Sequence, residues 1–265
     1  MSVGVLYDST KCIGCRGCQV ACKQWNERKA EQTTNTGSIE NPPLMTAKTV
    51  TKIKFAEVEY NGKFQFVFAK QQCMHCEEPA CVTACPVSAL QKHPEGAVTY
   101  DDKRCFGCRY CMVACPFGIP NFDWDTPVPW IRKCTFCFDR QGGGLQPACV
   151  TTCPTSALLY GNREDLLVEA RARISASPGR YVDHIYGEKE VGGTSWLMLS
   201  PVPFDLLGFP KLQQEPVVAN VERAMGFVPP VLVGMAALMT GIYWVTKRRS
   251  QNAKGGKAQE GAVKK

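Results

Sequence analysis

Histidine is scarce in this sequence, which contains only 3 in 265 residues. No Ser/His/Asp constellation, paired-carboxylate motif or zinc-hydrolase motif stands out, so no bond-making or bond-breaking catalysis is predicted. The triple glycine at 142–144 lacks the flanking residues of the common nucleotide-binding loops, and we interpret it as a flexible loop. Charged residues make up 21% of the chain against 45% hydrophobic residues, which excludes a disordered polyelectrolyte and allows a buried core.

Cysteine, by contrast, is abundant, because the chain has 16, far more than an ordinary enzyme needs. The cysteines divide into four groups of four, with none left over. In chain order the groups are Cys12, Cys15, Cys18, Cys22; Cys73, Cys76, Cys81, Cys85; Cys105, Cys108, Cys111, Cys115; and Cys134, Cys137, Cys149, Cys153. The first and third groups have the spacing C-x2-C-x2-C-x3-C, and the other two keep its ends around a longer middle gap. Proline follows the last cysteine in every group but the first, where Lys23 stands.

This spacing is that of bacterial [4Fe–4S] ferredoxins, in which three closely spaced thiolates wrap one cubane and a fourth comes from a distant segment. Two other uses of cysteine compete with this interpretation. Zinc ribbons use separated C-x2-C pairs rather than continuous runs, and a cluster of cysteines this dense suits a shared metal site better than disulfides. We therefore interpret all 16 cysteines as ligands of four [4Fe–4S] clusters.

Internal repetition favours the same interpretation. The segments Ala80–Leu90 and Ala148–Leu158 are identical at 9 of 11 positions, and Cys12–Cys22 matches Cys105–Cys115 at 8 of 11. A shared ligand motif would explain the cysteines but not the matching Val-Thr, Ser-Ala-Leu and Gly-Cys-Arg runs. The chain is therefore predicted to be built from duplicated cluster-binding units.

The segments between the cysteine groups predict a few regular elements. Residues 24–50 have the composition of a long polar loop, and residues 53–68 predict a hairpin whose Asn61-Gly62 pair suits a type I′ turn. Residues 96–100 predict a short strand, and residues 163–175 a helix that ends near Pro178.

His75 lies between two predicted ligands in the run Cys73-Met-His-Cys76. A histidine in that position can tune a cluster through hydrogen bonds around its ligands. The alternative is an ordinary loop histidine, hydrogen bonded or exposed, and the sequence leaves both interpretations open.

A run of 23 residues without a charge extends from Ala224 to Thr246. A helix of that length, at about 1.5 Å per residue, crosses a hydrocarbon core of roughly 30 Å. The run has Tyr243 and Trp244 near its far end, as at a membrane interface, and is followed by Lys247-Arg-Arg249 and a polar tail. A buried core helix is the alternative, but it would end in folded sequence. We predict a membrane span.

The charge of the chain indicates the orientation of this helix. The residues after Thr246 include 7 basic residues and 1 acidic residue, so they carry +6 of the net charge of +7. We therefore expect the tail on the cytoplasmic side and the cluster domain in the periplasm. The remaining chain is almost neutral, which removes the reason to expect nucleic acid. Met1–Leu6 has no basic or apolar signal region, so we expect co-export with a partner that carries the signal.

The sequence resembles the four-cluster iron–sulfur electron-transfer subunits of membrane-bound respiratory oxidoreductases, over almost its whole length. Cys12–Asn26 and Asn41–Ala47 are similar to the β subunit of respiratory formate dehydrogenase. Cys73–Cys81 is shared by several members of the family. The segments closer to the subunit that serves periplasmic nickel–iron hydrogenase are Gly4–Thr10, Cys108–Pro116 and Tyr186–Thr194.

The resemblance also implies which cysteines share a cluster, with the first and fourth groups in one ferredoxin-like module and the second and third in another. The implied ligand sets are Cys12, Cys15, Cys18, Cys153; Cys22, Cys134, Cys137, Cys149; Cys73, Cys76, Cys81, Cys115; and Cys85, Cys105, Cys108, Cys111. The exchange of the fourth cysteine follows the ferredoxin rule. The sequence by itself still allows the first group to pair with the second.

Together these observations predict an α+β fold of two ferredoxin-like double-cluster modules with loop insertions, plus one C-terminal transmembrane helix. The expected parts are a cluster region (1–160), a partner-contacting extension (161–223), the membrane helix (224–246) and a basic cytoplasmic tail (247–265).

The expected role is an electron wire without substrate chemistry of its own. It would connect a catalytic subunit, a molybdopterin or tungstopterin formate dehydrogenase or alternatively a nickel–iron hydrogenase, to a membrane cytochrome b or quinone-reactive subunit. The predicted span holds no histidine, so a histidine-ligated membrane haem would belong to that partner. A zinc-stabilised, membrane-tethered scaffold and a soluble ferredoxin with a buried C-terminal helix are the competing interpretations.

Overall fold

A computed structural model describes residues 2–35, 37–125 and 130–262, so the last three residues of the basic tail lie outside the described residues. The chain divides into two units, Met1–Val218 and Ala219–Lys265. The helices are α1 (Gly17–Trp25), α2 (Ala80–Thr83), α3 (Tyr110–Ala114), α4 (Phe138–Gly142), α5 (Ala148–Thr151), α6 (Arg163–Ala176), η1 (Glu190–Gly192) and α7 (Val217–Ala262). The strands are β1 (Val3–Asp8), β2 (Thr51–Tyr60), β3 (Lys63–Gln72), β4 (Leu90–Lys92), β5 (Val98–Tyr100), β6 (Asn121–Phe122), β7 (Ile131–Arg132), β8 (Leu158–Asn162) and β9 (Trp196–Leu199).

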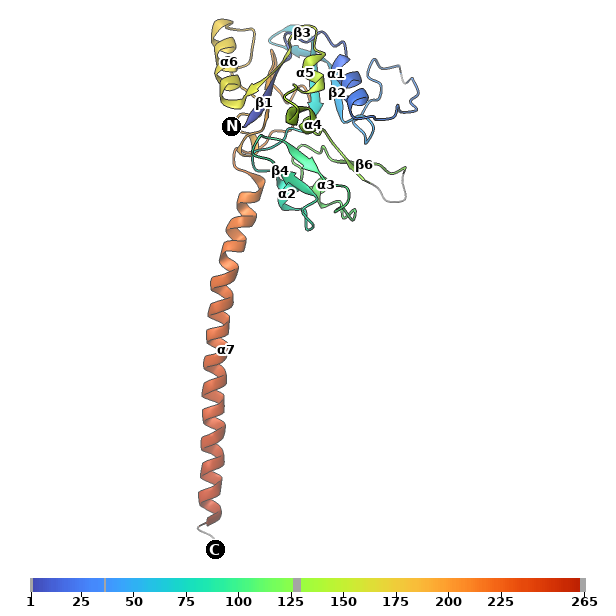
Figure 1. Ribbon diagram of the computed structural model, residues 1–265. Helices are drawn as coiled ribbons and strands as arrows, with labels where there is room; N and C mark the ends of the chain where they lie inside the picture. Colours follow the sequence, from blue (N-terminus) through green and yellow to red (C-terminus); the bar gives the residue numbers. More distant parts are fainter. Residues whose placement is uncertain (1, 36, 126–129, 263–265) are drawn as a thin grey trace. The chain divides into compact units, whose positions relative to one another are not determined.

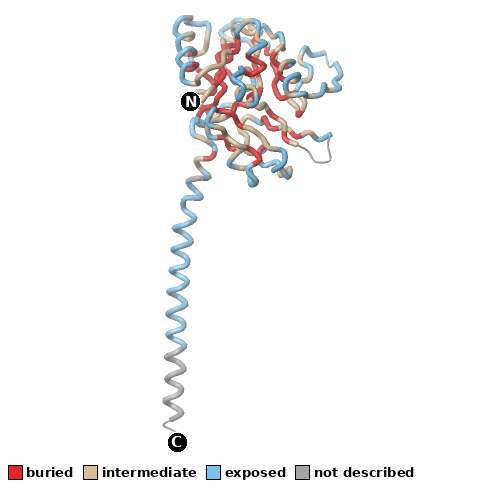
Figure 2. The backbone as a smooth tube through the Cα atoms, viewed as in Figure 1, coloured by how far each residue is buried: buried red, intermediate tan, exposed pale blue. Residues whose placement is uncertain are grey.

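Strand β1 is the centre of a three-stranded sheet made from segments that are far apart in the sequence (Figure 1). β8 pairs with it antiparallel and β9 parallel, so that Val5 lies opposite both Tyr160 and Trp196. Both faces of β1 are covered, and Figure 2 shows the buried backbone concentrated in this part of the first unit. The sheet thus joins the N-terminus, the end of the fourth cysteine group and the segment that follows it.

Helix α6 covers one face of this sheet. Leu166, Leu167 and Ala170 are buried against Leu6 and Leu197, and Asn162 caps the helix by accepting a hydrogen bond from the Glu164 backbone N–H. The helix runs from Arg163 to Ala176, which confirms the prediction for residues 163–175. Residues 161–218 therefore belong to the same compact unit as the cysteine groups.

Strands β2 and β3 form a long hairpin, as the alternation and the Asn-Gly pair predict. Its register runs from the pair Thr51 and Gln72 to the pair Tyr60 and Lys63. Asn61 and Gly62 have φ values of 52° and 69°, the left-handed conformation that a type I′ turn needs at both central positions. Side chains opposite each other on the two strands share one face, which becomes important for the cavities described below.

The short helices next to the cysteines pair in the way that the family resemblance implies. α1 packs against α5, and α2 packs against α3, so the first cysteine group meets the fourth and the second meets the third. α2 and α5 have the same sequence, Ala-Cys-Val-Thr, and each follows a proline. Ser88 and Ser156, at the same offset after the two cysteine–proline pairs, share a left-handed backbone with φ of 51° and 52°. The repeat is therefore structural as well as sequential.

The second unit is made by helix α7. It begins at Val217, directly after Pro216, rather than at Ala224, so Pro229 and Pro230 lie inside it and not at its start. Its stretch Val217–Ser250 is long and apolar enough to cross a membrane. Large apolar side chains along it, including Phe227, Leu232 and Trp244, are exposed.

Candidate metal centres

Two cavities in the first unit are each walled by four cysteines from the first and last groups. About 350 Å³ of space in and in front of each is not filled by protein atoms, and part of it is open to solvent. One is lined by Cys12, Cys15, Cys18 and Cys153, which we call set 1. The other is lined by Cys22, Cys134, Cys137 and Cys149, which we call set 2. Cys153, the last cysteine of the fourth group, thus lies with three cysteines of the first group, and Cys22, the last of the first group, lies with three of the fourth.

The remaining cysteines lie together in two further sets. Burial raises the pKa of Cys76, and the nearby thiolates of Cys73, Cys115 and Cys81 raise it further. These four residues form set 3. Burial likewise raises the pKa of Cys111 to about 12, with contributions from the thiolates that complete set 4. Set 4 consists of Cys85, Cys105, Cys108 and Cys111.

The four sets follow one another as neighbours. Burial is the main reason that the pKa values of Cys22, Cys134 and Cys81 are raised, but a thiolate of an adjacent set also raises each of them. The pairs that connect successive sets are Cys22 with Cys18, Cys134 with Cys73, and Cys81 with Cys111. Sets 1, 2, 3 and 4 therefore form a series in that order.

A common backbone feature turns the chain around each set. In the first Cys-x-x-Cys run of each group the third residue is in the left-handed conformation, namely Gly14, His75, Gly107 and Phe136, with φ of 67°, 51°, 80° and 59°. In three of these runs the same residue donates its backbone N–H to the first cysteine sulfur. The distances are 3.5 Å from Gly14 N to Cys12 Sγ, 3.4 Å from Gly107 N to Cys105 Sγ, and 3.3 Å from Phe136 N to Cys134 Sγ. Donors of this kind stabilise negative charge on sulfur.

Two buried polar groups also line the cavity of set 2. The side-chain amide of Gln72 and the indole Nε1 of Trp196 form no hydrogen bond with any residue that the structure describes. A buried donor left without an acceptor is unfavourable by about 1–3 kcal/mol, so a group that fills the cavity and accepts hydrogen bonds fits here. Inorganic sulfide and cysteine sulfur are such acceptors.

The thiols themselves fit a site that stabilises their charged form. Burial raises the pKa of Cys149 to about 12, so its thiolate is costly near neutral pH, and bound iron would compensate for that cost. Among the described residues, no group of three His, Cys, Asp or Glu side chains is arranged to hold a single metal ion. Four cysteine thiols around each cavity are a donor set that fits an iron–sulfur cluster.

His75 is completely buried between set 3 and set 2. Its Nδ1 accepts a hydrogen bond of 2.9 Å from the Val98 backbone N–H, and its ring stacks on Phe136 with 4.8 Å between centroids. Burial, followed by the positive charges of Lys133 and Lys92, lowers the pKa of His75 well below its usual value, so the ring is neutral. Its Nε2 then carries the proton and has no hydrogen-bond partner within the described part of the chain. His75 is a buried, hydrogen-bonded residue and not an exposed loop histidine.

Lys70 is the main feature that the sequence interpretation missed. It is 1% exposed and lines the cavities of both set 1 and set 2. Burial alone would lower the pKa of Lys70, yet the thiolates of the two sets raise it above the ordinary value. The only signal in the sequence was its place after Phe64, Phe66 and Phe68 in an alternating apolar pattern, and that signal is weak because Phe64 and Phe66 are exposed.

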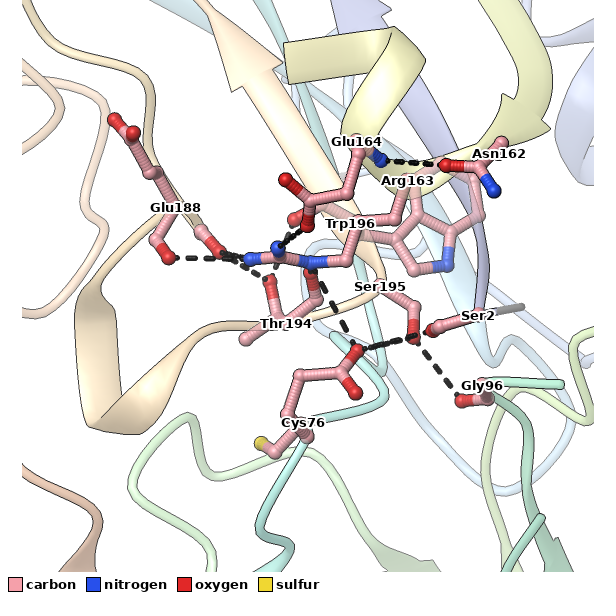
Figure 3. A network of polar contacts seen from close by, with 12 residues as sticks. Ser2, Cys76, Gly96, Asn162, Arg163, Glu164, Glu188, Thr194, Ser195 and Trp196 are labelled. Atoms are coloured by element: carbon pink, nitrogen blue, oxygen red, sulfur yellow. Dashed lines mark hydrogen bonds and ion pairs between the residues drawn. The ribbon is translucent and has the colours of Figure 1, made fainter. Parts of the chain in front are cut away.

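A polar network fixes the loop of set 3 to the segment before β9 (Figure 3). Cys76 forms an isolated β-bridge with Thr194, and the Ser195 backbone N–H donates to the His75 carbonyl at 3.0 Å. The Ser195 hydroxyl donates to Glu77 Oε1 at 3.2 Å. Arg163 lies above this contact, with its Nε 3.8 Å from Glu77 Oε1 and donating to the Thr194 carbonyl at 2.9 Å.

Replacement of this arginine should loosen the set 3 loop. In the variant Arg163→Leu we expect local opening around Glu77 to become easier by about 3 kcal/mol, because the carbonyl of Thr194 and the carboxylate of Glu77 lose a buried charged donor. Hydrogen exchange at the amides of Glu77 and Ser195 should therefore accelerate roughly a hundredfold. The control is Arg171→Leu, which removes an exposed ion pair and should change exchange by less than about 0.5 kcal/mol. Equal effects of the two variants would contradict this role.

Comparison with known proteins gives a consistent result. A family model described as a 4Fe-4S dicluster domain matches residues 64–163, and a second with the same description matches residues 11–89. A protein of Nitratidesulfovibrio vulgaris is 45% identical over 258 residues, which cover 95% of this chain and 69% of that protein.

Two named groups of proteins are also similar. The hydrogenase-2 operon protein HybA of Escherichia coli O157:H7 is 36% identical over 95% of this chain and 86% of its own length. The iron-sulfur subunit of the nitrate-inducible formate dehydrogenase of Escherichia coli K12 is 40% identical over 72% of this chain and 66% of its own length.

Proposed function

This chain belongs to the family of 4Fe-4S dicluster proteins that includes HybA and the formate dehydrogenase iron-sulfur subunits, and on that premise we propose how its residues carry electrons. It is an iron–sulfur electron-transfer subunit. What remains to be assigned is the number of clusters, the residues that hold them and the proteins at either end.

We assign one [4Fe–4S] cluster to each of sets 1 to 4, with all sixteen cysteines as ligands. The single observation that carries the assignment is the pair of cavities in which the last cysteine of one group joins three cysteines of another. The sulfur-directed backbone N–H groups and the unpartnered donors of Gln72 and Trp196 support it. A bound cluster supplies a one-electron couple, and the chain's residues hold its sulfurs and exclude water.

The series of four sets provides a path for electron transfer through the protein. Sets 1 and 4 are at its two ends, and each successive pair of sets is close enough for its cysteine charges to interact. The exposed cysteine is Cys15 of set 1, and exposed apolar residues flank set 4 at Phe106 and Val113. We infer that electrons enter and leave at these ends, in either direction.

We propose a formate dehydrogenase catalytic subunit, containing molybdopterin or tungstopterin, as the electron partner. The 40% identity to formate dehydrogenase iron-sulfur subunits supports it. A nickel–iron hydrogenase is the second candidate, because the similarity to HybA covers 95% of this chain against 72% for the formate dehydrogenase subunit. We assign partner contact to the polar loop predicted for residues 24–50, as one of the expected loop insertions, and to the extension 161–223. A groove lined by Arg171, Glu188 and Lys211 lies in that extension.

We further propose that α7 crosses the inner membrane once, beside a cytochrome b or quinone-reactive subunit. The charge distribution supports a cytoplasmic tail (247–265) and a periplasmic cluster region, because 7 basic residues follow the apolar run. Co-export with the catalytic partner would bring the folded, loaded cluster region across.

Iron and acid-labile sulfide analysis of the purified full chain tests the assignment. Four clusters should give roughly 16 iron and 16 sulfide per chain, and dithionite should bleach the visible absorption. A zinc-stabilised scaffold would instead contain about four zinc ions with no labile sulfide and no redox response. That result would overturn the assignment.

A further inference from the structure

Lys70 is a buried cation shared by two cluster cavities. On strand β3 it lies directly opposite Ile53, and both side chains line the cavity of set 1. Lys70 also lines the cavity of set 2, together with Thr51 and Gln72 from the next pair on the same face of the hairpin. No other lysine or arginine lines both of these cavities among the described residues.

The ammonium group has few partners of its own. It donates a hydrogen bond to the Thr51 hydroxyl and lies 5.5 Å from the centre of the Trp196 ring. In the part of the chain that the structure describes, no carboxylate forms an ion pair with it, in contrast to the neighbouring Lys52, which pairs with Glu40. A buried charge without a counter-ion is strongly unfavourable, so the arrangement requires negative charge nearby. The cysteines of the two sets supply it as thiolate ligands of the clusters assigned to these sets.

We propose that Lys70 is a positioning cation that raises the reduction potentials of both the set 1 and the set 2 clusters. The inference rests on the proposed assignment of clusters to these sets. Reduction adds one electron, and therefore one unit of negative charge, to the iron–sulfur site. Lys70 stabilises that charge across a water-excluded cavity wall, where charges interact more strongly than in water. The electron arrives from one neighbouring redox centre and leaves to the next, no bond is broken, and Lys70 keeps its proton throughout.

The electrostatic effect of Lys70 can be tested by substitution more cleanly than that of Lys133. Lys133 is also buried, but its ammonium donates to the backbone carbonyls of Val98 and Cys134, so its role in folding and in electrostatics cannot be separated by substitution. Lys70 makes no hydrogen bond to a backbone carbonyl in the described residues, and its side chain can be exchanged for an apolar one of similar length. It raises the potentials of two successive clusters together, so the difference between them changes little.

An EPR-monitored redox titration of the full, cluster-loaded chain tests the proposal with three variants. In Lys70→Met, two of the four clusters should be at least tenfold harder to reduce, which is about 59 mV for a one-electron couple, while the other two stay unchanged. Lys70→Arg keeps the positive charge, so its cluster potentials should be close to those of the unmodified protein. The control Lys54→Met removes a lysine from the opposite face of the same hairpin, where its Nζ donates to the Leu207 carbonyl, and should shift no cluster.

The same samples are analysed for iron and labile sulfide. Failure of the cluster assignment can then be distinguished from failure of the proposed role of Lys70. Full cluster content with unchanged potentials in Lys70→Met overturns the role of Lys70 and leaves the cluster assignment intact. An equal shift in Lys70→Met and Lys70→Arg also overturns it, because it indicates packing rather than charge. Lys70→Met could also lose the set 1 and set 2 clusters altogether. In that case, a Lys70→Arg variant that keeps both clusters supports the electrostatic role of Lys70. Loss of the two clusters in both variants refutes that role. Absence of labile sulfide in the unmodified protein overturns both inferences.

Discussion

Loss of Cys15 together with Cys153 removes one cluster, whereas loss of Cys15 together with Cys22 removes two. This is the expected result if the last cysteines of the first and fourth groups exchange cavities, because Cys15 and Cys153 then belong to set 1 and Cys22 to set 2. The alanine double variants should retain about 12 and about 8 iron atoms per chain, respectively, from a starting value of roughly 16. Labile sulfide should fall in parallel.

The comparison is internally controlled, since both double variants remove two thiols and share Cys15→Ala. Ligation within each group, without exchange, would invert the two iron values, because Cys15 and Cys22 would then share a cluster. A third double variant, Cys137→Ala with Cys22→Ala, lies wholly in set 2 and should again retain about 12 iron atoms. Loss of all iron in every variant would contradict four independently held clusters.

Two arginines in the middle of the apolar stretch of α7 should release the protein from membranes. Met235→Arg and Leu238→Arg together are expected to disfavour insertion by about 5–7 kcal/mol, at roughly 2.5–3.5 kcal/mol for each charge near the bilayer centre. Carbonate-washed membranes should therefore lose the double variant to the supernatant, as they should lose a chain truncated before residue 224.

The matched control places the same side chain where it is tolerated. Thr246→Arg adds an arginine beside Lys247, at the end of the charge-free run, and should leave membrane retention unchanged. If the double variant and the truncated chain stay in the washed membranes, partner subunits and not α7 anchor the protein. Release of the control along with the double variant would contradict a transmembrane position for α7.

Local patterns account for the parts of the fold that were predicted. The Asn61-Gly62 pair and its flanking alternation determine the hairpin, and Asn162 with the acidic residues that follow it determines the start of α6. The grouping of the cysteines is equally local, because spacing and repetition are visible in a single sequence.

Long-range relations account for what was not predicted from residues alone. Nothing near Val5 indicates that its strand pairs with Tyr160 and Trp196, since a strand's partners are selected by packing across the whole unit. The exchange of Cys22 and Cys153 came only from family resemblance for the same reason. Lys70 was missed because charge normally indicates solvent, and the start of α7 was placed too late because Pro216, a common residue at helix starts, was not used.

The central place of β1 has a consequence for the order in which the protein is completed. β1 and the first cysteine group are synthesised first, but their strand partner β8 and their ligand partner Cys153 are synthesised more than half a chain later. Sets 3 and 4, by contrast, draw all their cysteines from residues 73–115 and close over a much shorter length of chain. Because loop closure becomes less favourable with length, the middle of the chain is expected to mature before its ends. Under the proposed assignment, we therefore expect the set 1 cluster to be completed only after Cys153 has been synthesised.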